Sequence, residues 1–263
     1  MNLYLIRHGE TPWNKARRFQ GQTDVPLNDF GRELAAVTRR AMPRLDWARV
    51  YASPLCRALE TARILVEDRT APDGAPLADR ILTDDRLKEI AFGPYEGADV
   101  SAVTHDPTHP MHECLWHPDR YVAPEGAESF DDLIARARSF MDGVLRPLEA
   151  ELPAEANVLV VAHGALIRAV VVGLGRKSVA DFWRVPYHNC CVTRLTLCEG
   201  QFTLEDEARI YYDSEQAAWG WRQWLSDSQK GNGDLSWQSE VWQAALPFEE
   251  SSASAPSEEE AAP

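Results

Sequence analysis

The sequence predicts an α/β protein, a three-layer α/β/α sandwich with a mixed, mostly parallel central sheet. Short apolar runs typical of buried strands alternate with longer segments whose apolar residues recur at helical spacing, as in residues 128–148. Residues 157–162 are apolar at every position after the asparagine, which is typical of a parallel strand buried on both faces. Together these patterns predict helices on both sides of one sheet.

The elements follow one another in an order that suits this fold. The predicted strands cover residues 3–6, 49–52, 80–83, 157–162, 192–197 and 201–204. The predicted helices cover residues 30–42, 55–66, 128–148 and 165–174. Asn28 is an N-cap signal for the first helix, Pro43 ends it, and Pro54 is expected at the first position of the second. Residues 11–26 predict a loop over the sheet edge.

The charge balance limits the kinds of partner. The chain of 263 residues carries 41 acidic and 27 basic residues, a formal net charge of −14. Nucleic-acid binding requires a basic face, so we expect no nucleic-acid partner. An anionic substrate would have to be met by local positive charge, because the overall field repels it.

The cysteines and the amino terminus bear on the compartment. The five cysteines are at positions 56, 114, 190, 191 and 198, an odd number without CxxC spacing, which indicates reduced thiols in a cytoplasmic protein. Adjacent Cys190 and Cys191 are expected to serve in packing rather than as a redox pair. The first strand begins within two residues of the start, and no apolar run approaches ~18 residues, so we expect no signal peptide and no membrane partner.

The first strand runs directly into Arg7-His8-Gly9. Open α/β sheets bind ligands at the carboxyl edge, where this triplet is expected to lie. Neutral histidine is a nucleophile, arginine holds an anion in a fixed fork, and glycine lets backbone N–H groups approach it. The combination indicates phosphoryl transfer to histidine, although one such triplet could equally be a strand-end histidine with local hydrogen bonds.

Four further blocks follow this triplet in order. They are Arg18 to Leu27 (RFQGQTDVPL), Ala52 to Ala62 (ASPLCRALETA), Leu87 to Gly97 (LKEIAFGPYEG) and Val160 to Arg168 (VVAHGALIR). In this order and spacing, the blocks closely resemble the histidine phosphatase superfamily, the phosphoglycerate-mutase-like proteins. The resemblance covers about residues 1–205 and implies the fold of that family.

The resemblance implies a role for each site residue. His8 would be the nucleophile that forms a phosphohistidine, and Glu89 the general acid and then the base for water. Arg7, Arg57 and His163 would hold the phosphoryl oxygens. The remaining phosphate-binding residues that it implies are Asn14, Gln20, Gly21 and Gly164.

Other charged residues in these blocks are expected to be structural. Arg168 is predicted to be an ion-pair partner on the helix after His163. Glu10 and Glu96 are also predicted to be structural, although Glu96 is a rival to Glu89 as the acid.

The segment between residues 97 and 126 separates branches of the family. Mutases acting on phosphoglycerate resemble one another in having paired arginines here that grip the substrate carboxylate, whereas this chain offers only Arg120 and no lysine. Pro124 to Ser129 (PEGAES), with Arg136 downstream, looks like a segment of the family's phosphatases, including α-ribazole phosphatase and broad-specificity enzymes. We therefore expect a phosphomonoester hydrolase for a small phosphorylated metabolite. A phosphoglycerate mutase and a non-catalytic phosphate-docking module are the alternatives.

The same segment is rich in possible metal ligands. The cluster consists of His105, His109, His112, Cys114 and His117. Prolines interrupt it and its spacing matches no defined zinc site, so solvated or substrate-facing loop residues are the preferred interpretation. We expect no metal and no other cofactor.

The chain is predicted to have three parts. Residues 1–205 would form the catalytic domain, 206–246 a tryptophan-rich helical extension, and 247–263 a disordered acidic tail. Five of the nine tryptophans lie between residues 219 and 242. The extension is expected to pack onto the catalytic domain, and a homodimer formed through it is the alternative.

Overall fold

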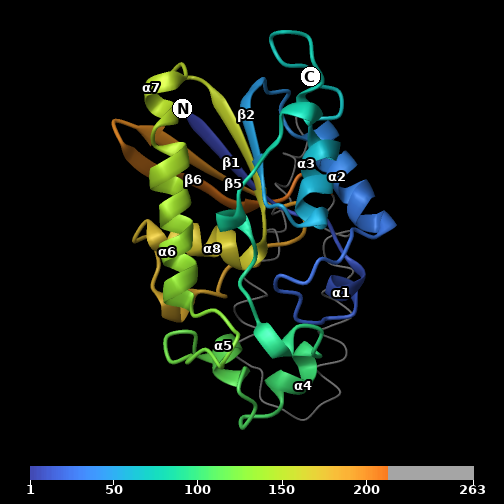
Figure 1. The fold of residues 1–263 in the computed structure, drawn as a ribbon, viewed down its shortest axis with the longest axis vertical. Helices are drawn as coiled ribbons and strands as arrows, with labels where there is room; N and C mark the ends of the chain where they lie inside the picture. Colours follow the sequence, from blue (N-terminus) through green and yellow to red (C-terminus); the bar gives the residue numbers. More distant parts are fainter. Residues whose placement is uncertain (213–263) are drawn as a thin grey trace, which may run out of the picture.

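A six-stranded sheet forms the centre of the computed structural model, which describes residues 1–212 (Figure 1). The strands are β1 (Asn2–Arg7), β2 (Trp47–Ala52), β3 (Leu82–Thr83), β4 (Asn157–Ala162), β5 (Val192–Cys198) and β6 (Gln201–Arg209). Their order is β3-β2-β4-β1-β5-β6. The first four strands are parallel to one another, and β5 and β6 are antiparallel to their neighbours, so the predicted mixed, mostly parallel sheet is confirmed.

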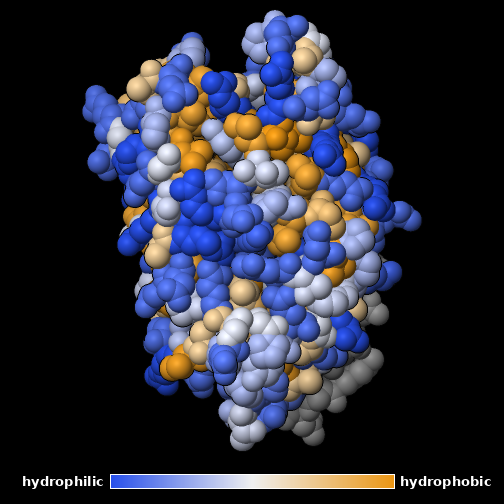
Figure 2. Space-filling model, viewed as in Figure 1, coloured by the Kyte–Doolittle hydropathy of each residue, from blue (hydrophilic) through white to orange (hydrophobic). Residues whose placement is uncertain are grey.

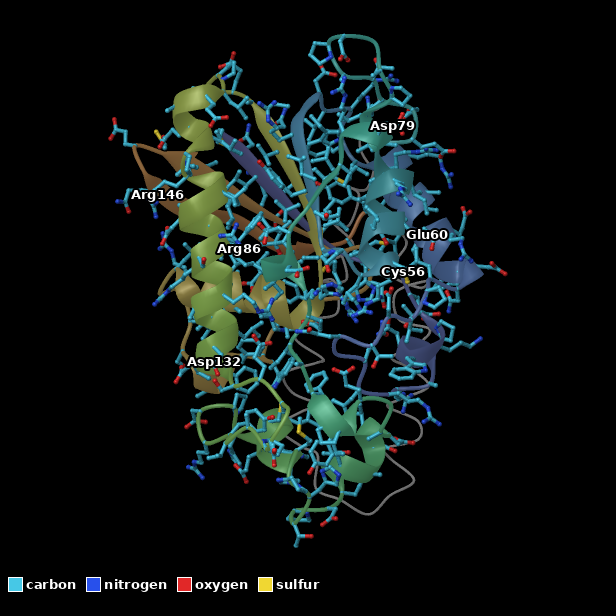
Figure 3. All side chains as sticks on the ribbon, viewed as in Figure 1. Cys56, Glu60, Asp79, Arg86, Asp132 and Arg146 are labelled. Atoms are coloured by element: carbon cyan, nitrogen blue, oxygen red, sulfur yellow. The ribbon has the colours of Figure 1, made fainter. Side chains whose placement is uncertain are left out.

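Helices cover both faces of the sheet. The α-helices are α1 (Pro12–Lys15), α2 (Asp29–Ala41), α3 (Cys56–Leu65), α4 (Val100–Thr104), α5 (His112–Trp116), α6 (Phe130–Phe140), α7 (Leu148–Glu151) and α8 (Gly164–Gly173). Short 3₁₀ turns lie at Leu77–Arg80, Asp85–Leu87, Gly93–Tyr95 and Val179–Asp181. Helices α6 and α8 pack on one side of the strands and α2 and α3 on the other (Figure 1). Figure 3 shows Cys56 on α3 and Asp132 on α6, on opposite sides of the sheet.

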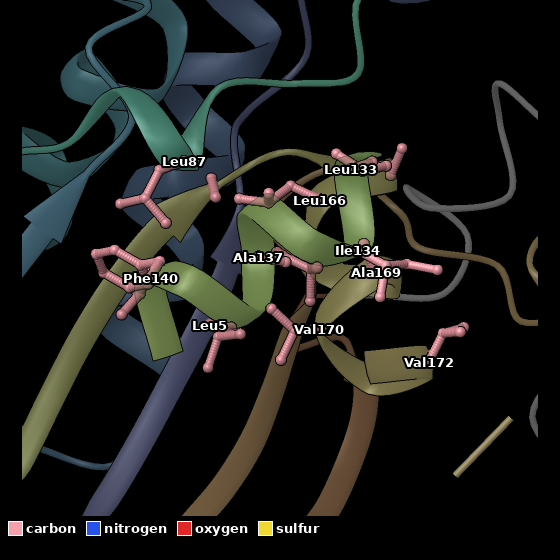
Figure 4. Packing of buried hydrophobic residues seen from close by; sticks show 14 of the residues in the cluster. Leu5, Leu87, Leu133, Ile134, Ala137, Phe140, Leu166, Ala169, Val170 and Val172 are labelled. Carbon is pink, nitrogen blue, oxygen red and sulfur yellow. The ribbon is translucent and has the colours of Figure 1, made fainter. Parts of the chain in front are cut away.

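The pleat of β1 explains the layers. Leu3 and Leu5 belong to the apolar cluster that α6 and α8 complete, where Figure 4 shows Leu5 near Val170. Tyr4 and Ile6 belong to the cluster on the α3 side. Successive side chains of a strand point to opposite faces, so this strand is buried by a helical layer on each side. The three-layer sandwich is therefore confirmed.

Several element boundaries differ from the prediction. Pro54 does not begin the second helix, because Leu55 is the N-cap and α3 begins at Cys56. The long helix predicted at 128–148 is divided into α6, a π-helical turn at Met141–Leu145 and α7. The strand predicted at 80–83 is reduced to two residues, because a 3₁₀ turn occupies Leu77–Arg80. Helix α1 lies within the predicted loop at 11–26.

The last strand is longer than predicted. β6 continues to Arg209, which pairs with Val192 of β5. Residues 206–209 are therefore part of the sheet and not of a helical extension. Residues 213–246 of the predicted extension, and the acidic tail predicted at 247–263, lie outside the described residues.

The helices of the described part of the chain differ from those that span a membrane. None of the helices within residues 1–212 combines the length and apolar composition needed to span a bilayer. The face in Figure 2 is mainly hydrophilic, with apolar side chains visible between α6 and α3, over the strands.

Strand register brings distant parts of the chain to one edge. Arg7 at the end of β1 pairs with Ala162 at the end of β4, and Ala52 at the end of β2 pairs with Val161. The residues that follow these strand ends are His8, Ser53 and His163. They therefore lie side by side at the carboxyl edge of the sheet. Helices α1, α4 and α5 lie beyond this edge (Figure 1).

Candidate active site

The His8 side chain is buried and its tautomer is defined by one contact. Its Nδ1 lies 2.7 Å from the carbonyl oxygen of Gly9. A carbonyl oxygen can only accept, so Nδ1 carries the proton and Nε2 keeps its lone pair. Burial, followed by the charges of Arg57 and Arg7, holds the pKa of His8 well below its ordinary value. The ring is therefore neutral at physiological pH, as nucleophilic attack requires.

The His163 ring faces His8. The two ring centroids are 5.1 Å apart at an interplanar angle of 61°. Nε2 of His163 lies 2.8 Å from Oγ of Ser53, while its buried Nδ1 has no hydrogen-bond partner among the described residues. The Ser53 oxygen already accepts from the N–H of Leu55, so its hydroxyl can donate to Nε2. Nδ1 then carries the proton and can donate it to an anionic oxygen.

Arg57 is completely buried in the first turn of α3. It donates to the carbonyl oxygens of Thr23 at 2.8 Å and Gly21 at 2.6 Å. The Gln20 amide orientation that satisfies both of its neighbours places the oxygen 2.7 Å from Nε of Arg57. Burial lowers the pKa of Arg57 to about 10, so the group stays charged at neutral pH. Gln20 and Gly21, predicted beside the phosphate, therefore hold this guanidinium.

Arg7 lies at the end of β1, beside the start of α8. It donates through Nη1 to the carbonyl oxygen of Tyr187, and its buried Nε has no partner in the described part of the chain. A Cβ placed on Gly164 would lie 3.4 Å from that Nε. Gly164 therefore leaves the space that Arg7 occupies, and the free Nε–H is available to an anion.

Glu89 is held at the amino terminus of α8. Its Oε1 accepts from the N–H groups of Ala165 and Leu166, each at 3.1 Å, and from that of Ile90 at 3.0 Å. Backbone donors at a helix amino terminus stabilise a carboxylate. The carboxylate therefore lies one turn from His163, at the same sheet edge.

Asn14 forms part of a small amide network at the site. Its Oδ1 accepts from the backbone N–H and hydroxyl of Thr11, at 3.2 and 3.1 Å, and lies 3.4 Å from the amide nitrogen of Asn189. The Asn189 amide also donates to the carbonyl oxygen of His8 at 3.0 Å. Because its oxygen is occupied, Asn14 would meet a ligand with its NH₂ group.

This arrangement of two histidines and two arginines can be compared with known proteins. The family model described as the histidine phosphatase superfamily, branch 1, matches residues 3–208. The chain belongs to the histidine phosphatase superfamily.

Relatives of the chain within this superfamily carry different names. A probable phosphoglycerate mutase, GpmB, of Yersinia pestis is 30% identical over 195 residues, which cover 74% of this chain and 84% of that protein. YhfR of Bacillus stearothermophilus has a TM-score of 0.67 and 30% identity, covering 80% of this chain and 97% of its own. A mycobacterial glucosyl-3-phosphoglycerate phosphatase, solved with VO3, has a TM-score of 0.64 and 29% identity, covering 78% and 97%. The fold and the family are thus shown.

Two other acids near the site have structural contacts. The Glu96 carboxylate accepts from the N–H groups of Gln22 at 2.9 Å, Thr23 at 2.7 Å and Phe92 at 3.2 Å. Glu10 accepts from the Asn28 amide at 2.7 Å. Glu96 therefore fixes the loop that holds Arg57, as its predicted structural role requires.

Arg168 differs from its prediction. It forms no ion pair with any acid within residues 1–212, and instead donates to the carbonyl oxygen of Val185 at 2.9 Å. Its guanidinium also lies against the rings of Trp183 and Tyr187. The predicted ion pair is wrong, because a loop carbonyl and two aromatic faces take the place of a carboxylate.

The side chains of the histidine-rich segment do not converge on one point. His105 bonds to the carbonyl oxygen of Ser101, His112 stacks on Trp116, and the completely buried Cys114 packs into the core. Within residues 1–212, no three His, Cys, Asp or Glu side chains are arranged to hold a metal ion.

The structure adds residues that the sequence did not single out for the site. Ser53 contacts His163, the Tyr187 carbonyl contacts Arg7, and Asn189 contacts the backbone of His8. Ser53 lies within a recognised block, so its position could have been considered. Tyr187 and Asn189 lie in a loop without periodicity, and only the tertiary fold brings that loop next to Arg7 and His8.

Proposed function

We propose that this member of the superfamily is a phosphomonoester hydrolase that acts on a small phosphorylated metabolite through a phosphohistidine. The observation that supports this most strongly is the pairing of His8 with His163. A neutral imidazole with a free Nε2 faces a second imidazole whose Nδ1 has no hydrogen-bond partner within residues 1–212, and their centroids are 5.1 Å apart. One phosphoryl group placed between them would be reached by both rings.

In the first proposed step, the Nε2 lone pair of His8 attacks phosphorus and the bond from phosphorus to the leaving oxygen breaks. Arg7, Arg57 and His163 hold the phosphoryl oxygens, and each charge-assisted contact contributes roughly 1.5–3 kcal/mol. Glu89 in its acid form gives its proton to the leaving oxygen, so that an alcohol departs.

In the second step, water attacks the phosphohistidine. Glu89, now a carboxylate, takes a proton from the water, and the bond from nitrogen to phosphorus breaks with its electron pair returning to Nε2. The backbone donors at the start of α8 stabilise the carboxylate form that this step uses. Inorganic phosphate is the product.

Hydrolysis is favoured over mutase activity by the segment that carries α4 and α5. Its one cation between residues 97 and 126, Arg120, is exposed to solvent. Arg136, further along, is paired with Glu128 at 2.7 Å. This segment therefore does not supply two arginines that are free of ion pairs and could bind a substrate carboxylate. The similarity to GpmB keeps the mutase as the second candidate.

The reaction products separate the candidates. We expect incubation of the full chain with phosphoglycerates, sugar phosphates, nucleotides and α-ribazole phosphate to release inorganic phosphate from at least one of them. A positional isomer without free phosphate would establish a mutase instead. Binding of vanadate without turnover on any member of the panel would establish a docking module.

The nucleophile has its own test. His8→Ala should lower phosphate release by on the order of 10³-fold or more, because it removes the ring nitrogen that attacks phosphorus. Wild-type protein stopped during turnover should carry one added phosphoryl group by mass spectrometry, and the variant should carry none. A variant that hydrolyses at the wild-type rate would exclude His8 as nucleophile.

A further inference from the structure

Arg168 contacts three residues of a loop whose side chains take no part in the proposed chemistry. Its Nη2 donates to the carbonyl oxygen of Val185, and the guanidinium carbon lies 5.1 Å from the ring centroid of Trp183 and 4.4 Å from that of Tyr187. Burial lowers the pKa of Arg168 to about 10, so the group remains charged at neutral pH. A planar cation thus contacts three residues of one irregular segment.

Tyr187 connects this segment to the phosphate-binding groups. Its side chain is buried, with the ring against Arg168 and the hydroxyl donating to Glu207 at 2.9 Å. Its main-chain carbonyl accepts from Nη1 of Arg7. That carbonyl is the hydrogen-bond acceptor that orients the Arg7 fork.

The two guanidinium groups are also close to each other. A Cβ on Gly164 would lie 3.2 Å from Nη1 of Arg168 and 3.4 Å from Nε of Arg7. Neither arginine is in an ion pair within residues 1–212, so no carboxylate fixes either of them there. Like charges repel, so Arg168 disfavours any rotamer of Arg7 that brings the two guanidinium groups closer together. The backbone carbonyl and this repulsion together restrict Arg7 to the pocket.

We propose that Arg168 is a positioning residue for phosphate binding: it fixes the 183–187 segment, so that the Tyr187 carbonyl aims Arg7 at the phosphoryl group. The proposal rests on the proposed function, because it takes Arg7 as a ligand of the phosphoryl oxygens. It assigns to Arg168 an effect on anion affinity that is transmitted entirely through Arg7.

The test is a double-mutant cycle with orthovanadate as the probe, measured by calorimetry on the full chain. Arg168→Met should weaken vanadate binding by about tenfold, the loss expected when a hydrogen bond to a charged group is misaligned. Arg7→Met should weaken it at least as much, and the double variant no more than Arg7→Met alone. Wild-type affinity in Arg168→Met, or additive losses in the double variant, would overturn the proposal.

Matched variants separate positioning from general damage. Arg138 also donates to a backbone carbonyl, that of Gly173 at 3.0 Å, at the far end of α8. Arg138→Met should leave vanadate binding within about twofold of wild type. Because Arg138 lies on α6 and only bonds to α8, a tenfold loss there would overturn the assignment by showing that removing any arginine bound to α8 has the same effect.

Arg168→Lys carries the test if the methionine variant does not fold. An ammonium keeps the charge but cannot present a planar fork to a carbonyl and two rings at once, so binding should still weaken by about threefold or more. Full affinity in the lysine variant would overturn the proposal. If the variants lose vanadate binding as expected but the wild-type chain hydrolyses no substrate, the proposed function alone would be contradicted. A wild-type chain that does not bind vanadate would contradict both.

Discussion

Glu89 and Glu96 are close in sequence, but their carboxylates have different surroundings. Glu89 contacts the first N–H groups of α8, beside His163, whereas Glu96 bonds to the N–H groups of Gln22 and Thr23 in the loop around Arg57. At the scale of the residue, only the first is placed to exchange a proton with a group in the site. The Glu96 carboxylate instead fixes the backbone of the loop around Arg57.

This difference can be tested with leaving groups of different acidity. Glu89→Gln should lower the first turnover by about 10²-fold or more on an alkyl phosphate, whose leaving oxygen needs a proton, and much less on an aryl phosphate. Glu96→Gln should lower both to the same extent, because it disturbs binding. Single-turnover release of the alcohol measures this. Equal losses on the two substrates in Glu89→Gln would exclude it as the acid.

The buried histidines give the protein a defined response to acid. Burial, with nearby arginine charge, holds the pKa values of His8 and His163 well below the ordinary value, and burial lowers the pKa of His188 to about 4. The folded chain keeps these rings neutral, whereas the unfolded chain protonates them below about pH 6.5. The unfolded state then binds more protons, so stability decreases as the pH falls.

Each such histidine should lower the free energy of unfolding by up to about 1.4 kcal/mol per pH unit below about 6.5. Denaturant titrations at pH 7, 6 and 5 measure this loss. His163→Gln should flatten the dependence by one proton, and the exposed His105→Gln serves as its control. A free energy of unfolding that stays constant over this interval would show that the rings are not kept neutral.

At the scale of the element, the loop before α2 is held by one close approach. Gly21 has φ of +53°, and a Cβ there would lie 2.0 Å from Oε1 of Glu96. Any larger residue would push the Glu96 carboxylate away and move the Gly21 carbonyl that accepts from Arg57. The glycine therefore couples loop geometry to the position of Arg57.

Gly21→Ala should destabilise the fold by more than about 1 kcal/mol and reduce kcat/KM by about tenfold or more. Gly74 is a matched control, since it also has positive φ, +83°, but nothing within 4 Å of a Cβ. Gly74→Ala should cost only about 1 kcal/mol and leave kcat/KM unchanged. Thermal unfolding and steady-state kinetics of both variants provide the comparison. If the two behave alike, the contact with Glu96 has no role.

At the scale of the whole molecule, the sheet and the three residues after it bring the end of the described chain back to the active site. β6 runs to Arg209, and the Tyr212 hydroxyl donates to the carbonyl oxygen of Asn189 at 2.6 Å. Asn189 in turn contacts the backbone of His8. Tyr212 therefore supports the backbone of His8 through Asn189, although more than 200 positions separate Tyr212 from His8 in the sequence.

Truncation separates this support from the remainder of the chain. A chain ending at Tyr212 should keep the sheet and its fold. A chain ending at Glu205 loses the last residue pairs between β5 and β6 and the contact to Asn189. We expect the shorter chain to unfold at least several degrees lower and to lose turnover. Light scattering on the full chain and on residues 1–212 then tests the alternative that the predicted extension forms a homodimer. Equal unfolding temperatures for the two truncations would contradict the support from Tyr212.

The sequence determined the parts of this protein that depend on local pattern. Continuous apolar runs predicted β1 and β4, and the Asn28 cap and the apolar stripe of α6 predicted helices, because these signals act over a few residues. The blocks around His8, Arg57, Glu89 and His163 predicted which residues would meet. The tertiary structure decided how they are held: strand register set the two rings 5.1 Å apart, and the Gly9 carbonyl set the tautomer of His8.

Contacts that join segments far apart in sequence carry no local signal. Arg168 against Trp183 and Tyr187, Asn189 beneath His8, and the Glu96 carboxylate in the Gly21 loop are all of this kind. The predicted ion pair of Arg168 was wrong for the same reason, because charge in a sequence does not show which acceptor the folded chain supplies. Burial and hydrogen-bond partners are properties of packing, and only the assembled layers define them.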